Sequence, residues 1–101
     1  MKVLDKLASS DFAPHLNQTF RVRLDGVEPI DLELVNVTEA GSASRTEARN
    51  PFSLLFLGPV SSQYLLQHTY SLEHEQIGML ELFIVPLGLE EGRMRYEAIF
   101  T

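Results

Sequence analysis

The sequence contains no cysteine, so it can form neither a disulfide nor a thiolate metal site, and it has no cysteine nucleophile. It also lacks a run of about 18 apolar residues, the length that a membrane-spanning helix needs. Residues 1–12 contain no apolar segment of the kind found in secretory signal peptides. These absences predict a cytoplasmic protein that would leave the cell only as part of an assembly.

Basic residues are scarce, with 8 Lys and Arg against 14 Asp and Glu, which gives a net charge of -6. Such a charge repels phosphate backbones and anionic lipids, so we expect neither nucleic acid nor a membrane as a partner. The two basic pairs, Arg21 with Arg23 and Arg93 with Arg95, are each flanked by acidic residues. We interpret them as cross-strand charge partners rather than as a phosphate-binding track.

Internal repeats and linkers are also missing, which favours a single β domain over residues 1–101. Apolar and polar residues alternate with a period of two in much of the chain, as is typical of β-strands. We therefore predict an all-β fold of about six antiparallel strands in a small sandwich or partly open barrel. Short helical turns are expected at the amino terminus and after the strand that begins at Phe52.

Three strands expected over residues 69–101 organise the rest of the chain. A hairpin with His74 opposite Gly78 joins two apolar faces, whereas a shift by one residue would turn a whole apolar set toward water. Leu82 should then be among the most buried residues of the core. A loop over residues 88–93 leads to the third strand. The predicted pairs of the hairpin are Tyr70 with Leu82, Leu72 with Leu80 and His74 with Gly78. The apolar face of the third strand consists of Met94, Tyr96, Ala98 and Phe100.

A strand is expected over residues 18–25, followed by a turn at residues 26–29 and a second strand that begins at Ile30. Pairing Leu24 with Ile30 keeps the apolar side chains of both strands on one face. It also brings opposite charges together, and each such pair adds about 0.2 to 1 kcal/mol. The charge pairs expected from this register are Arg23 with Asp31 and Arg21 with Glu33.

The apolar pattern slips by one residue after Leu34, which predicts a β-bulge near Leu34 or Val35. Residues 39–50 are small and polar without a period, so we predict a mobile loop there. Residues 52–57 are apolar at nearly every position, which indicates a strand buried on both faces. The Gly-Pro pair at residues 58–59 is expected to end this strand.

The amino terminus is expected to form short helical turns, because Leu4, Leu7 and Ala8 have helical spacing and Ser10 can cap a turn. Turns this short are not stable alone and need a surface to pack on. We expect that surface to be the back face of the sheet, near Phe83.

The three histidines do not form an evident metal site. In an extended strand His68 and His74 would lie about 20 Å apart, too far to bind one metal, and His15 is distant in sequence. We favour a His74 that is hydrogen-bonded in the core or at the end of the hairpin.

Other reactive residues point to no chemistry. The carboxylate pairs at residues 73 and 75 and at residues 81 and 97 are interpreted as a solvated face, since nothing indicates a pocket that would separate their pKa values. No G-x-S-x-G or phosphate-loop motif occurs. Tyr64, Tyr70 and Tyr96 are assigned to the core rather than to a sugar or nucleotide site. We predict a protein that is not an enzyme and has no cofactor.

Four blocks of sequence resemble a family of small bacterial proteins catalogued only as a domain of unknown function. They are FAPHLNQTFRV (residues 12–22), FSLLFLGP (52–59), QHTYSLEHEQIGMLELFIVPLG (67–88) and YEAIF (96–100). The resemblance brings no assigned activity, cofactor or catalytic residue. Such proteins are similar to those found near phage-tail-like genes, including tail-collar-type proteins, which implies an accessory or structural role.

The back face of the predicted sheet is more apolar than a solvated face needs to be. We therefore expect a non-enzymatic interaction or structural module, as an accessory of a phage-tail-like or extracellular assembly, that binds a protein partner or forms a homo-oligomer. A small-ligand-binding β-barrel is the alternative, and it would need a concave pocket with convergent polar groups. The candidate interface residues are Leu55, Leu57, Met79, Phe83, Val85 and Ile99.

Overall fold

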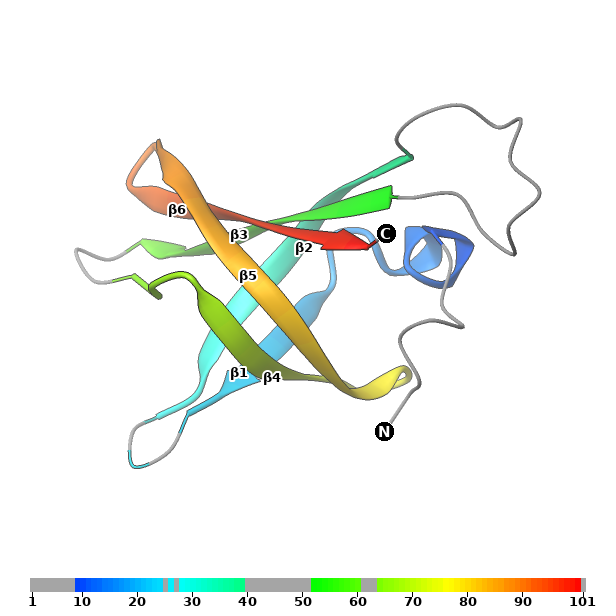
Figure 1. The fold of residues 1–101 in the computed structure, drawn as a ribbon, viewed down its shortest axis with the longest axis horizontal. Helices are drawn as coiled ribbons and strands as arrows, with labels where there is room; N and C mark the ends of the chain where they lie inside the picture. The colour runs from blue at the N-terminus through cyan, green and yellow to red at the C-terminus, as the bar shows by residue number, and fades with distance from the viewer. Residues whose placement is uncertain (1–8, 25, 27, 40–51, 61–63, 101) are drawn as a thin grey trace.

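The computed structural model describes residues 9–24, 26, 28–39, 52–60 and 64–100. They form six antiparallel strands that close into a barrel in the order β1-β2-β3-β6-β5-β4 (Figure 1). The strands are β1 (Thr19–Arg23), β2 (Ile30–Glu39), β3 (Phe52–Val60), β4 (His68–His74), β5 (Gly78–Glu90) and β6 (Arg93–Phe100). Two 3-10 turns, η2 (Ser9–Asp11) and η3 (Ala13–His15), precede them. The predicted all-β fold is confirmed, and of the two expected architectures the chain adopts the barrel.

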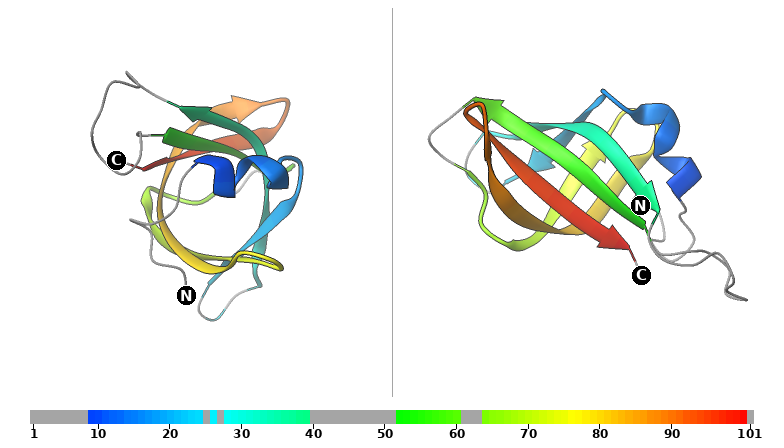
Figure 2. Two further views of the ribbon diagram at one scale, coloured as in Figure 1. Left: turned by 90° about the vertical axis from the view of Figure 1, so that its right-hand side faces the viewer. Right: turned by 90° about the horizontal axis from the view of Figure 1, so that it is seen from above.

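Side chains fill the barrel, because alternate residues of every strand point inward. Figure 2 shows the strands as a ring when the barrel is seen end-on, with the two N-terminal turns lying at one end. The core residues with less than 2% exposure include Phe20, Val22, Leu32, Leu34, Phe52, Leu54, Phe56, Leu72, Leu80 and Ile84. The sheet therefore has a packed interior and an outer surface that faces solvent.

The β4–β5 hairpin has the register that the sequence predicts, with His74 opposite Gly78 and Leu72 opposite Leu80. Leu82 lies opposite Tyr70 and is only 3% exposed, so its predicted burial is also confirmed. β6 continues the apolar face as expected.

The predicted loop over residues 88–93 is wrong, because β5 continues to Glu90 and β6 begins at Arg93. Glu91 and Gly92, with φ values of 52° and 82°, form a two-residue turn in which both residues have positive φ. Such turns match the twist of the flanking strands. The longer β5 pairs with β4 in its first half and with β6 in its second half, and so forms a corner of the barrel (Figure 1).

The predicted register of β1 and β2 is wrong by two residues. Ile30 lies opposite Val22 rather than Leu24, and Asp31 lies opposite Arg21. A shift by two leaves the same residues on the inner face, so the apolar pattern alone cannot distinguish the two registers. Only the length of the turn decides between them.

The predicted bulge in β2 is confirmed, since the pairing with β3 shifts between Leu34 and Asn36. Val35 is the extra residue and stays half-buried, whereas Val37 returns to the inner side and packs against the core. The bulge thus restores the apolar pattern for Val37 and bends the strand around the barrel.

β3 differs from the prediction in two ways. It does not end at Gly58 but runs to Val60, with an irregularity in its pairing to β6 between Leu57 and Val60. Its odd-numbered positions Ser53, Leu55 and Leu57 are half-buried on the outer face, so the strand is not buried on both faces. A helical turn was expected after this strand, but none forms over residues 64–67, the described residues between β3 and β4.

The N-terminal turns close one end of the barrel. Phe12 has no exposed surface, and its ring lies 5.8 Å from that of Phe52 and 5.5 Å from that of Phe100. The turns therefore pack into the core end and not on the back face of the sheet, which corrects the prediction. Asn17, with a φ of 68°, follows them at the entry to β1. The predictions for Leu4, Leu7, Ala8 and the loop at residues 40–50 lie outside the described residues.

Candidate functional site

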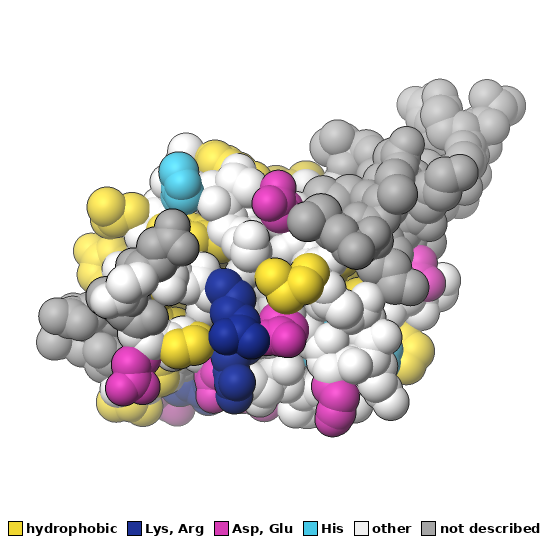
Figure 3. All heavy atoms as spheres, turned by 90° about the horizontal axis from the view of Figure 1, so that it is seen from below, with side chains coloured by type: hydrophobic (Ala, Val, Ile, Leu, Met, Phe, Trp, Pro, Cys, Tyr) yellow, Lys and Arg dark blue, Asp and Glu magenta, His cyan; other side chains and the backbone are white. Residues whose placement is uncertain are grey.

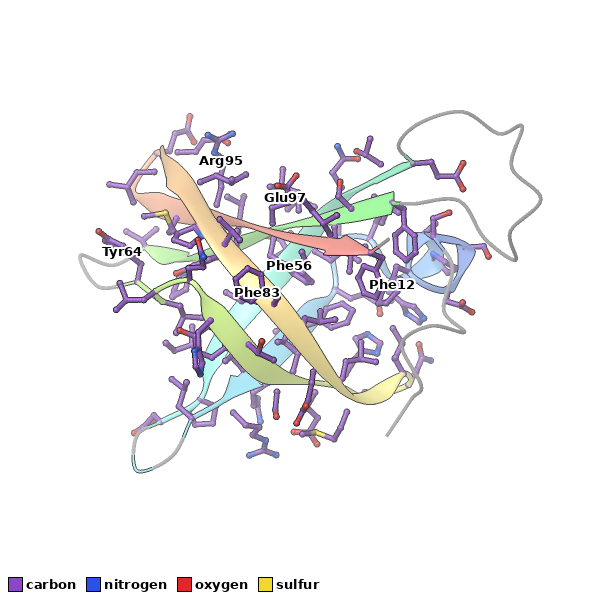
Figure 4. All side chains as sticks on the ribbon, in the orientation of Figure 1. Phe12, Phe56, Tyr64, Phe83, Arg95 and Glu97 are labelled. Atoms are coloured by element: carbon purple, nitrogen blue, oxygen red, sulfur yellow. The ribbon has the colours of Figure 1, made fainter. Side chains whose placement is uncertain are left out.

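The outer face of the three neighbouring strands β3, β6 and β5 carries five of the six predicted interface residues. Leu55 and Val85 lie on either side of Glu97, and Leu57 lies beside Arg95. Phe83, two residues before Val85, lies on the same side of β5, because side chains alternate along a strand. For the same reason Ile99, two residues after Glu97, lies on the same side of β6 as Glu97. Figure 4 shows Phe83, Arg95 and Glu97 on this part of the barrel. We call this set the outer sheet face: Leu55, Leu57, Phe83, Val85, Arg95, Glu97 and Ile99.

Its apolar residues remain substantially accessible to solvent. Ile99 is 63% exposed and Phe83 is 51% exposed, while Leu55, Leu57 and Val85 are half-buried. The sixth predicted residue, Met79, does not join them. It lies opposite Glu73 of β4, and Glu81 separates it from Phe83 along β5.

Two opposite charges occupy the middle of the outer sheet face. Arg95 lies between Leu57 and Gly88, and its guanidinium lies over Gly88, where an added Cβ would be 3.9 Å from Nη2. Its Nε is buried and has no hydrogen-bond partner among the described residues, and the nearest carboxylate oxygen, on Glu90, is 4.0 Å away. That distance is too long for a hydrogen bond. Glu97 makes no ion pair with any residue in the part of the chain that the structure describes.

A second exposed apolar surface lies at the end of the barrel that carries the β5–β6 hairpin, and sequence reasoning missed it (Figure 1). It was missed because β5 was expected to end before Leu89 and β3 before Val60. We call it the end surface, with the exposed fraction of each side chain in parentheses: Val60 (76%), Tyr64 (51%), Leu66 (71%), Leu87 (43%) and Leu89 (61%).

The four arginines of the two basic pairs each lie within 4.0 Å of a carboxylate oxygen, but the predicted pairs of Arg21 with Glu33 and Arg23 with Asp31 are wrong. Arg21 pairs with Asp31 at 3.4 Å. Arg23 donates from Nε to Glu73 at 2.9 Å, across the β1–β4 boundary and not to β2 as expected. Figure 3 shows only a short run of basic side chains on the underside of the barrel, bordered by acidic ones. This surface offers no continuous track for phosphates.

Two histidines that are far apart in sequence meet at the end of the barrel near η3. The rings of His15 and His74 are 4.6 Å apart, and both side chains contact Oε1 of Gln18, at 2.9 and 2.8 Å. His74 is only 5% exposed, and its Nδ1 accepts hydrogen bonds from the backbone N–H groups of Gln76 and Ile77. The prediction that His74 is hydrogen-bonded at the end of the hairpin is confirmed. Its proximity to His15 was missed, because only the docking of η3 brings the two together.

Burial lowers the pKa of His74 below its usual value of 6.5, and the neighbouring His15 lowers this pKa further, while Glu75 opposes the shift. Among the described residues there is no group of three or more His, Asp or Glu side chains that could hold a metal ion.

The tyrosines do not converge on one site. Tyr96 is buried and Tyr70 is half-buried, whereas Tyr64 is exposed (Figure 4), so the assignment of Tyr64 to the core is wrong. The hollows between the strands are open surface depressions. One of about 380 Å³ is lined by residues 17–19 and 74–76, and one of about 400 Å³ lies along Thr19, Arg21, Arg23, Glu73 and Glu75.

No helix in the described part of the chain is long and apolar enough to cross a membrane. The chain belongs to the family described as Domain of unknown function (DUF6916), whose model matches residues 7–100. This match confirms the resemblance noted from the four sequence blocks. Searches of the curated proteins and of the solved structures gave no match.

Proposed function

We propose that this protein is a non-enzymatic interaction module that forms a symmetric dimer through its outer sheet face. The observation that carries the proposal is the arrangement of Arg95 and Glu97 two residues apart on β6, on a face where Leu55, Leu57 and Val85 are their neighbours. A buried donor without an acceptor costs about 1 to 3 kcal/mol, and an acceptor supplied by a partner would remove this cost at Nε of Arg95.

A second copy of the chain fits this face best. In a twofold dimer each surface meets itself, so neighbouring opposite charges can cross-pair if the axis passes between them. Arg95 of each copy would then meet Glu97 of the other. The apolar side chains of Phe83 and Ile99 would be withdrawn from water in the same contact. The net charge of -6 opposes further growth by repulsion.

The alternative, a small-ligand-binding barrel, is less well supported. Large side chains fill the interior of the barrel, among them Phe20, Phe56 and Tyr96, and the depressions lined by described residues are open to solvent. Ligand sites in small barrels are instead enclosed by the strands.

We further propose that the dimer serves as an accessory of a larger assembly of the phage-tail-like or extracellular kind. The resemblance of the four sequence blocks supports this role, and the lack of cysteine suits assembly in the cytoplasm. A pull-down from the native lysate, followed by identification of the bound proteins, tests it. Recovery of tail-type structural proteins would support the role, and recovery of none would count against it.

Sedimentation velocity on the purified protein at tens of micromolar tests the dimer. Ile99→Glu should shift the profile toward monomer with an unchanged far-UV spectrum, because a charge at this exposed position is harmless in a monomer but costly in an interface. Leu89→Glu is the matched control, since Leu89 is similarly exposed but lies on the end surface.

A dimer that persists in Leu89→Glu and dissociates in Ile99→Glu supports the outer sheet face. Dissociation in Leu89→Glu alone would move the interface to the end surface. A wild-type protein that is strictly monomeric at these concentrations would refute self-association. Leu57→Glu is a weaker test than Ile99→Glu, because Leu57 is half-buried within β3 between Glu33 and Arg95.

A further inference from the structure

The hydrogen bonds around His74 determine which of its ring nitrogens carries the proton. Nδ1 faces two donors, the backbone N–H groups of Gln76 at 3.0 Å and Ile77 at 3.2 Å, so it must be the acceptor. The proton of the neutral ring is therefore on Nε2, which donates to Oε1 of Gln18 at 2.8 Å. The same oxygen accepts from Nδ1 of His15 on η3.

This network connects three parts of the barrel end. His74 ends β4, and the N–H groups it binds belong to the turn that leads into β5. Through Gln18 it is joined to η3, which also carries the core residue Phe12 at its start. The ring of His74 packs 4.6 Å from that of Phe20 inside the barrel. His74 therefore holds the turn directly and is also hydrogen-bonded to the N-terminal segment through Gln18.

A second proton cannot be added to His74 without breaking this network. Protonated Nδ1 would be a donor pointing at two other donors, and both backbone N–H groups would lose their acceptor. Rotating the ring does not help, since both nitrogens of the cation are donors. The ring must leave its position. This movement breaks its hydrogen bond to Oε1 of Gln18, the oxygen that also accepts from His15.

The charged surroundings agree with this geometry. The titratable groups that face His74 are His15 from η3 and Glu75 from the turn. Gln18, just before β1, and Phe20 on β1 contribute neutral side chains. A positive charge on His15 disfavours a second one nearby, and the Glu75 carboxylate only partly compensates.

We propose that His74 is a pH-sensitive latch, which keeps the β4–β5 turn closed while neutral and releases the turn when it is protonated. Burial lowers the pKa of His74 in the folded chain below 6.5, the value expected in the unfolded chain. The latch contributes its full stability above pH 6.5. As the pH falls below 6.5 the unfolded chain takes up a proton first, so stability is lost until the folded ring also titrates. One proton taken up on unfolding raises the unfolding equilibrium constant by at most about tenfold per pH unit.

The test compares urea unfolding and amide hydrogen exchange of the full chain at pH 7.5 and pH 5.5. His74→Asn is the informative variant, because its Oδ1 lies where Nδ1 was and can accept from the same N–H groups without titrating. We expect wild type to lose stability, and the protection factors of Gln76 and Ile77 to fall, at the lower pH. Both effects should be greatly reduced in His74→Asn. His68→Asn, on the far end of β4, is the control and should behave as wild type.

Equal pH dependence in wild type and His74→Asn would overturn the latch, as would unchanged protection of Gln76 and Ile77. If His74→Asn does not fold, an NMR titration of wild type replaces it. The ¹⁵N shifts should then place the proton of neutral His74 on Nε2, and the Gln76 and Ile77 amides should titrate together with His74. Amides that titrate with His15 instead would overturn the proposal.

Discussion

The hydroxyl of Tyr96 accepts a hydrogen bond from the backbone N–H of Leu65 at 2.8 Å, across 31 positions of sequence. Tyr96 lies on β6 inside the barrel, and Leu65 belongs to the connector between β3 and β4. In a neighbouring hydrogen bond the tyrosine is the donor, because the hydroxyl of Tyr70 donates to the carbonyl of Leu66 at 2.7 Å. Two tyrosines therefore fix residues 65 and 66 of this connector, whose described part, residues 64–67, forms neither helix nor strand.

Tyr96→Phe should destabilise the fold by about 1 to 3 kcal/mol, because it leaves the buried N–H of Leu65 without an acceptor. Tyr70→Phe is the matched control. It frees only the carbonyl of Leu66, an exposed residue that water can reach, and should cost less than about 1 kcal/mol. Urea unfolding measures both. Equal losses in the two variants would show that the connector is not held by Tyr96.

Leu82→Ala should cost about 2 to 5 kcal/mol, because Leu82 is buried opposite Tyr70 and its loss leaves a cavity in the barrel. Leu89→Ala on the same strand is the control, since Leu89 is 61% exposed and should change stability by less than about 0.5 kcal/mol. Thermal and urea unfolding of both variants provide the comparison. A Leu82→Ala protein that melts within a degree of wild type would contradict the assigned core.

The sequence predicted the β4–β5 hairpin correctly because an error of one residue there would have exposed a whole apolar face. The bulge at Val35 was found by the same pattern. The same pattern did not predict the β1–β2 register, because a shift of two residues leaves the same side chains on the inner face. Ile30 therefore lies opposite Val22 instead of Leu24. Periodicity specifies which face a residue occupies, but turn geometry specifies its neighbour.

For the candidate site, too, the sequence predicted the face of a residue but not its neighbours. Five of the six interface residues could be placed on one face by parity alone, but their grouping around Glu97 depends on which strands are neighbours in the barrel. Met79 has the correct parity and lies too far along β5. The contact of His15 with His74 depends on where η3 docks, and no local pattern near residue 15 reports that.

Metal chelation should leave the melting temperature unchanged. Both ring nitrogens of His74 are already hydrogen-bonded, Nδ1 to backbone N–H groups and Nε2 to Gln18. His74 therefore has no free nitrogen with which to bind a metal ion together with His15. Melting curves with EDTA and with added zinc test this. A drop of several degrees with EDTA, or a rise with zinc that His15→Gln abolishes, would place a metal at the histidine pair.

Exchanging the charges at the centre of the outer sheet face should separate pairing between copies from simple loss of an apolar contact. Arg95→Glu alone places a new carboxylate of each copy against Glu97 of the other, and Glu97→Arg alone places a new guanidinium group of each copy against Arg95 of the other. Like charges brought together in an interface cost several kcal/mol, so each single variant should sediment as a monomer. The double variant carries both charges in reversed order and should recover the dimer.

Arg21→Glu is the control for a charge reversal elsewhere on the barrel, because Arg21 pairs with Asp31 on β1 and β2, away from this face. Exposed ion pairs contribute less than about 1 kcal/mol, so this variant should fold and remain a dimer. The double exchange leaves the total charge and the apolar surface of each chain unchanged. Recovery of the dimer would therefore require that Arg95 of one copy meets Glu97 of the other in the wild type. A double variant as monomeric as the two single ones, with an intact far-UV spectrum, would rule out this twofold arrangement.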